Sequence, residues 1–100
     1  MKKDEIMLDL AKNGYRLTWK GTEYTAEAIE MFLETEQTAT LKACKNVYPT
    51  IGLRNNTHWR NVERAVRHAF YRSGNQTDGR TAFEYIKLCA MRIKTKGSVC

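Results

Sequence analysis

Apolar residues recur at intervals of three and four along most of the chain, which is the spacing of one face of an α-helix. Alternation of the kind that marks β-strands is limited to the short stretch Tyr15–Trp19. One proline, six glycines and the lack of any repeat or low-complexity tract leave little sequence for long loops. The pattern predicts a single all-α domain, residues 1–100, of about five to six helices.

Threonines and glycines at the edges of the apolar segments mark where helices begin and end. Thr25, Thr38 and Thr57 are suitable N-caps, and Gly14 and Gly74 are suitable stops. The expected helices are Asp4–Asn13, Thr25–Glu34, Thr38–Tyr48, Pro49–Arg54, His58–Ser73 and Ala82–Lys94.

Three local signals refine these boundaries. Pro49 has no amide hydrogen and a fixed φ, so we expect it to end one helix and to begin the next. Asn55 and Asn56 suit the turn that follows. Thr81 and Glu84 have the spacing of a capping box at the start of the last helix.

The apolar stripes of the remaining helices predict the core. The residues expected to face inward are Ile6, Met7, Leu10, Ala11, Ile29, Phe32, Leu33, Leu41, Cys44, Val47, Tyr48, Phe83, Ile86, Cys89, Ala90 and Ile93. Tyr15 and Trp19 are expected to pack beside the turn-rich stretch that follows the first helix.

The helix expected over His58–Ser73 has two different faces. The inner face carries Val62, Ala65, Val66, Ala69 and Phe70. Trp59 lies on the same side and is expected in the core, with stacking on DNA as the alternative. The outer face carries Arg60, Arg64, Arg67 and Tyr71, flanked by Asn61, Glu63, His68 and Arg72. A solvated charged face is the plain alternative, but such a face usually mixes charge signs. Arg60 and Arg64 instead form a like-charged pair one turn apart, which favours a surface that binds an anion.

The positive charge is concentrated in the second half of the chain. Residues 1–50 carry seven lysines and arginines against eight acids, whereas residues 51–100 carry ten against three. This asymmetry predicts a positive surface that faces a polyanion. Nucleic acid is the first candidate, followed by an acidic protein or an anionic membrane surface.

A short helix, a tight turn and a long basic helix over residues 49–73 form the outline of a helix-turn-helix. The arginine fork matches two acceptors of guanine, glutamate accepts from cytosine, and asparagine pairs with adenine. The residues expected to read bases are Arg60, Asn61, Glu63 and Arg64. Those expected to contact phosphates are Arg54, Thr57, Arg67, His68, Tyr71 and Arg72, with Arg80 and Arg92–Lys96 as further sequence-blind contacts.

Several short blocks carry a family resemblance. They are Tyr48-Pro49, Ile51, Asn56-Thr57 and above all VERAVRHA (residues 62–69), with Gly21, Tyr24 and Glu27-Ala28-Ile29 upstream. In these blocks the chain resembles the C-terminal DNA-binding effector domain of the sporulation-initiation response regulator of endospore-forming bacteria. The resemblance implies an all-helical domain whose helix after Thr57 reads a short DNA element, often as tandem copies. By position it makes Glu63 and Arg64 base-reading residues and places Arg67 and His68 near the DNA backbone.

The chain departs from that family in three ways. Where the family has an arginine directly before Val-Glu-Arg, this chain has Asn61, and Arg60 points about 100° away, so we expect a different preferred DNA sequence. The loop after Gly74 is shorter than the family's segment that engages RNA polymerase. One hundred residues also leave no room for a receiver domain. We therefore expect neither activation by the usual route nor control by phosphorylation.

Other chemistry has little support in the sequence. Cys44, Cys89, Cys100 and the two histidines lack the spacing of a zinc site, and an odd number of cysteines fits a reducing compartment. There is no glycine-rich phosphate loop, nucleophile–base pair or carboxylate pair. We expect no enzymatic activity, cofactor, metal or small-molecule substrate. Because no apolar run is long enough to cross a bilayer and no secretory signal is visible, we expect a cytoplasmic protein without membrane contact.

Two functions from different classes follow. The favoured one is a stand-alone, sequence-specific regulator that binds double-stranded DNA as a repressor or accessory factor, as a homodimer or as tandem copies. The alternative is an interaction module that keeps the fold and antagonises a full-length regulator, with weak or non-specific DNA binding. RNA binding shares the charge argument, but a protruding helix suits the DNA major groove better.

Overall fold

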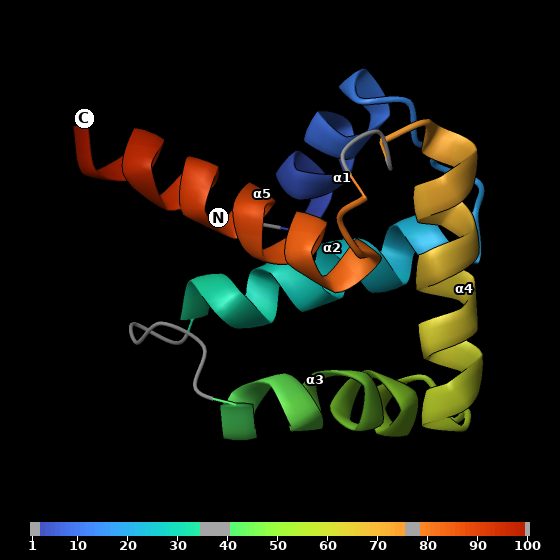
Figure 1. Ribbon diagram of the computed structural model, residues 1–100. Coiled ribbons are helices and arrows are strands. Elements are labelled where there is room, and N and C mark those ends of the chain that lie inside the picture. The colour runs from blue at the N-terminus through green and yellow to red at the C-terminus, as the bar shows by residue number, and fades with distance from the viewer. Residues whose placement is uncertain (1–2, 35–40, 76–78, 100) are drawn as a thin grey trace.

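The computed structural model describes residues 3–34, 41–75 and 79–99, and over these residues it contains helices and turns without a strand. The helices are α1 (Lys3–Lys12), α2 (Lys20–Glu34), α3 (Leu41–Arg54), α4 (Trp59–Ser73) and α5 (Ala82–Val99) (Figure 1). The all-α prediction is confirmed, with five helices over the described ranges.

The central helix is α2, which contacts each of the other four (Figure 1). Its residues Ala26, Ala28 and Ile29 are all buried, as a helix surrounded by neighbours requires. In contrast, α4 stands at one edge of the domain and crosses the ends of α2 and α3 (Figure 1). One long side of α4 therefore has none of the described helices packed against it.

Most of the predicted core is confirmed. Buried apolar residues include Ile6, Leu10, Ile29, Phe32, Val47, Ile86, Cys89 and Ala90, and Met7, Leu33, Tyr48, Phe83 and Ile93 pack against them. The side chains of Leu41 and Cys44 lie outside the described residues. Tyr85 is a core residue that the apolar stripe did not include, and its ring lies 6.1 Å from that of Tyr15 and 5.5 Å from that of Phe70.

The predicted start of the second helix was wrong, because α2 begins at Lys20 and Thr25 lies inside it. The Thr25 hydroxyl donates to the Gly21 carbonyl oxygen at 2.6 Å, the back-bond that a threonine makes within a helix. The Thr22 hydroxyl instead donates to the Arg16 carbonyl oxygen at 2.6 Å and ties the helix start to the preceding turn. A threonine has both options, so its presence alone does not mark a helix start.

The predicted break at Pro49 was also wrong, because α3 continues through it to Arg54. Proline removes one hydrogen-bond donor from the ladder, but its φ is compatible with a helix. Val47 and Ile51 on either side are both buried, so packing of the same face holds the helix together across the proline. Thr38, the predicted cap of this segment, lies outside the described residues.

The ends of α1 and the start of α5 follow the sequence signals. Gly14 has a φ of 97° and ends α1, as predicted. The capping box of α5 is present: the Thr81 amide donates to Glu84 Oε1 at 2.9 Å, and the Glu84 amide donates to Thr81 Oγ1 at 3.2 Å. This helix runs to Val99 rather than to Lys94.

Candidate nucleic-acid interface

The turn between α3 and α4 decides where α4 begins. Asn56 has a φ of 56°, its amide donates to the Leu53 carbonyl oxygen at 3.4 Å, and the Thr57 amide donates to the Gly52 carbonyl oxygen at 2.9 Å. These bonds form a Schellman motif that ends α3 and includes Thr57. His58 is therefore the N-cap of α4, and its Nδ1 accepts from the Arg60 amide at 3.1 Å. The prediction that Thr57 caps this helix was wrong by one residue.

Apart from Trp59, the two faces of α4 are as predicted. Val62, Val66, Ala69 and Phe70 are buried against the rest of the domain. The exposed residues are Arg60, Asn61, Arg64, Arg67, His68, Tyr71 and Arg72. Gly74, with a φ of 83°, ends the helix as its C-cap. The basic face of α4 is therefore not covered by the described part of the chain.

Two of the predicted base-reading residues are engaged within the helix. Asn61 Nδ2 donates to Thr57 Oγ1 at 3.0 Å, which folds the amide back toward the turn. Glu63 Oε2 lies 3.6 Å from Arg67 Nε, and this oxygen is buried. Burial raises the pKa of Tyr48, and the neighbouring Glu63 carboxylate adds to the rise. Among the four predicted base-reading residues, Arg60 and Arg64 are the exposed cations.

Trp59 is not in the core, contrary to the prediction. Its side chain is 42% exposed, and the Arg60 guanidinium carbon lies 5.6 Å from the ring centroid. The reason is its place at the first turn of α4, where its backbone rather than its ring meets α3. A Cβ added at Gly52 would lie 3.2 Å from the Trp59 amide nitrogen, so the two backbones pack directly. The ring therefore lies outside the crossing and is available to a partner.

The other predicted phosphate contacts come from segments outside α4. Arg54 ends α3 and is exposed beside the turn. Arg80 precedes α5, and Arg92 donates from its guanidinium to Cys89 Sγ at 3.5 Å. The side chains of Lys94 and Lys96 lie outside the described residues. Arg54 thus belongs with the α4 surface, whereas the α5 cations come from a separate helix.

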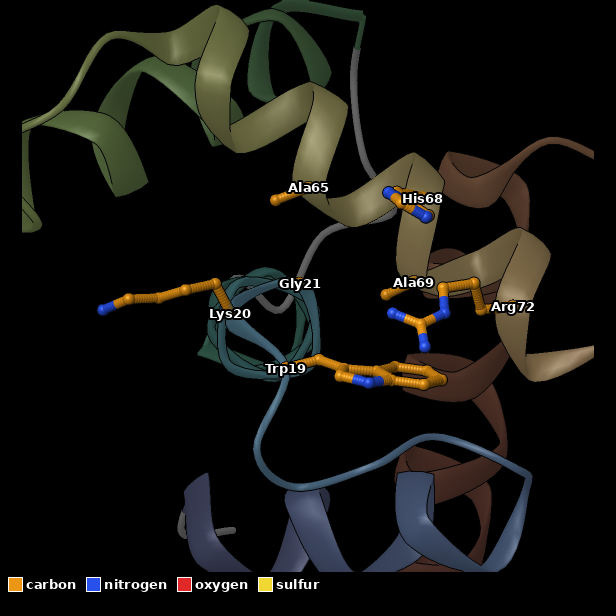
Figure 2. Close-up of a pocket in the computed structure, with 7 residues that line it drawn as sticks. All are labelled: Trp19, Lys20, Gly21, Ala65, His68, Ala69 and Arg72. Atoms are coloured by element: carbon orange, nitrogen blue, oxygen red, sulfur yellow. The ribbon is translucent and has the colours of Figure 1, made fainter.

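A pocket of about 210 Å³ lies where the start of α2 meets the second half of α4 (Figure 2). Its lining includes Trp19 and Gly21 from one side and His68, Ala69 and Arg72 from the other. The Arg72 guanidinium carbon lies 4.5 Å from the centroid of the Trp19 ring. Sequence reasoning assigned Trp19 only to packing, and no local signal paired it with Arg72, which is 53 positions further along the chain.

Within the described residues, no three His, Cys, Asp or Glu side chains form a group able to hold a metal ion. No helix in the described part of the chain is long and apolar enough to cross a membrane.

Residues 6–98 match the family model described as the C-terminal domain of sporulation initiation factor Spo0A. The chain belongs to the Spo0A C-terminal family. Neither a curated protein nor a solved structure matches the chain.

Members of the Spo0A C-terminal family are DNA-binding effector domains of transcription regulators. The chain is therefore a DNA-binding domain with a helix-turn-helix, and its partner is double-stranded DNA. The sequence resemblance is confirmed over nearly the whole chain, beyond the central blocks that first carried it.

Proposed function

We propose that this Spo0A-type domain binds a specific double-stranded DNA element by inserting α4 into the major groove, and that it acts as a repressor or accessory regulator. The observation that carries the proposal is the uncovered basic face of α4 at the edge of the domain. A helix with its side chains is about 10–12 Å across, which matches a major groove about 12 Å wide.

Arg64 is the base-reading residue on which the proposal depends most. It lies in the middle of the exposed face, one turn beyond Arg60. Its fork suits the O6 and N7 acceptors of guanine, a contact that discriminates by about 1–3 kcal/mol. Arg60 is the second base-reading residue. Asn61 and Glu63 contact base edges once they give up their present partners, Thr57 and Arg67.

The phosphate contacts frame this reading face on two sides. Arg54 and Thr57 lie at the turn before α4, where the positive end of the helix dipole favours an anion. Arg67, His68, Tyr71 and Arg72 lie along the second half of α4 and are exposed. Because each neutralised phosphate releases counterions, we expect affinity to fall steeply with rising salt.

The experiment is a selection of bound duplexes from random sequence with the purified chain, followed by the same selection with Arg64→Ala. The wild type should yield one preferred element, and Arg64→Ala should lose preference at one base pair while retaining most of its salt dependence. Lys87→Ala, at an exposed position of α5, is the matched control and should select the wild-type element. Equal weakening of Arg64→Ala on all duplexes would make Arg64 a phosphate contact and refute its base-reading role.

A second candidate function has one structural observation in its favour. Asn61 and Glu63 are both held by partners within the chain, which leaves fewer free groups for base reading. An interaction module that antagonises a full-length regulator would need the fold but not the specificity. Selection that returns no preferred element, together with co-purification of such a regulator, would favour this alternative.

A further inference from the structure

We propose that the pocket between α2 and α4 receives one backbone phosphate of the bound DNA, and that Trp19 positions Arg72 to hold it. This inference rests on the proposed function, because it assumes that α4 lies in the major groove. It adds a positioning residue, Trp19, from a different part of the chain. It also makes the pocket a phosphate-binding site, here called the seat, on one flank of the recognition helix.

The contact with Trp19 leaves one edge of Arg72 available. The guanidinium carbon sits 4.5 Å from the Trp19 ring centroid, and Figure 2 shows the guanidinium above the ring with one nitrogen directed toward it. A guanidinium carries five N–H donors in a planar fork, so the edge that faces away from the ring keeps two nitrogens for an anion. That edge matches two oxygens of a phosphate in bidentate fashion. The contact therefore orients Arg72 without using the donors of this edge.

The charge around the pocket suits an anion. Arg72 has no acidic partner among the described residues, and no acidic side chain belongs to the pocket lining that the structure describes. His68 lies one turn before Arg72 on the same flank of α4 and is exposed. Lys20 contributes less, because its side chain points away in Figure 2 and its ammonium lies 3.9 Å from Glu23 Oε2.

The start of α2 adds a fixed positive end to the same place. The helix begins at Lys20, and its partial positive charge lies at its N-terminus. Gly21 allows this end to approach α4 closely, since an added Cβ would lie 2.6 Å from the Cβ of Ala69. The seat is therefore built by two helices that cross with little separation.

The position of the seat matches one of the two phosphate backbones that border the major groove. His68 and Arg72 lie on the flank of α4 between its buried stripe and its arginine face. When a helix fills the major groove, its outer face meets base edges and its flanks meet the phosphates on either side. A phosphate at this flank would set the depth and register of α4 without reading sequence.

The test uses the duplex selected by the wild-type chain, with each backbone phosphate replaced in turn by an uncharged methylphosphonate. The wild type should lose about tenfold in affinity when one phosphate flanking the element is neutralised. Arg72→Gln should already be weaker by a similar factor and should lose little more at that phosphate. The slope of log affinity against log salt should also fall by about 0.9 in magnitude for Arg72→Gln.

Trp19 is tested by a pair of variants, because its partly buried ring also packs against the core. Trp19→Phe keeps a ring face and should retain the methylphosphonate profile of the wild type. Trp19→Leu keeps apolar bulk without a ring face and should resemble Arg72→Gln, with circular-dichroism melting used to verify that both variants fold. Lys87→Gln is the control and should leave the profile unchanged.

The two failures are distinguishable. If the wild type selects no preferred duplex, the proposed function fails, and the seat fails with it. If the wild type selects an element but Arg72→Gln shows the same sensitivity as the wild type at every phosphate, the seat alone is refuted. If Arg72→Gln loses little further affinity when that phosphate is neutralised but Trp19→Leu behaves as the wild type, the positioning role of Trp19 is refuted.

Discussion

The close crossing of α2 and α4 makes Gly21→Ala a sharp test of the structure. A Cβ at this position would meet the Ala65 carbonyl oxygen, which is its nearest neighbour, and would lie 2.6 Å from the Cβ of Ala69. Carbon atoms in contact are normally about 3.5–4.0 Å apart, so the two helices must separate by about 1 Å. The carbonyl oxygen belongs to the backbone and cannot rotate out of the way.

The size of the effect follows from two opposing contributions. Adding a methyl group to a well-packed interface typically costs about 1–3 kcal/mol, and the backbone contact places Gly21→Ala near the upper end. Replacing glycine by alanine inside a helix gains about 1 kcal/mol, but Gly21 is the second residue of α2, where the gain is smaller. We expect a net loss of about 2 kcal/mol in the free energy of unfolding, or about 8–16 °C in Tm for a domain of this size.

The assay is urea unfolding followed by circular dichroism, with thermal melting as a second measure. The double variant Gly21→Ala/Ala69→Gly removes one of the two obstructions and should recover part of the lost stability. A Gly21→Ala protein that is as stable as the wild type, or more stable, would refute the close crossing. It would also remove the physical basis for the phosphate seat beside it.

Two further predictions concern the folded state. Burial raises the pKa of Tyr15, Tyr48 and Tyr85 above the ordinary 10.0, so above about pH 10 the unfolded chain loses protons that the folded chain keeps. The free energy of unfolding should therefore fall as pH rises above 10, and Tyr15→Phe should flatten this decline in urea titrations; a decline of unchanged slope would contradict it. Asn56 has a φ of 56°, so Asn56→Val should cost about 1–2 kcal/mol and Asn56→Gly should cost little, and the reverse order in unfolding experiments would contradict the left-handed turn.

Local spacing was sufficient for the parts of the fold that depend on neighbours in sequence. The two faces of α4 follow from the helical period, so Val62 and Val66 face inward and Arg60 and Arg64 face outward in any packing that buries an apolar stripe. The capping box of Thr81 and the stop at Gly74 are likewise local. These features needed no knowledge of the partners.

Other features depended on which of two hydrogen-bonding or backbone arrangements a residue adopts in the folded domain. Thr25 is not an N-cap, because its hydroxyl donates to a carbonyl oxygen within α2. Pro49 does not end α3, because Val47 and Ile51 on either side of it are both buried. Thr57 is drawn into the turn that closes α3, so the cap of α4 moves to His58. In each case the local signal was compatible with two structures, and packing selected one.

What the sequence by itself determined is the amphipathic recognition helix and, through its family blocks, the class of domain that carries it. Only the tertiary structure decided that Trp59 lies outside the core and that Trp19 lies under Arg72. The physical reason is that both outcomes depend on how closely two helices cross, at Gly52 for the first and at Gly21 for the second. Crossing distance is set by contacts between residues of different helices, which the period of a single helix does not encode.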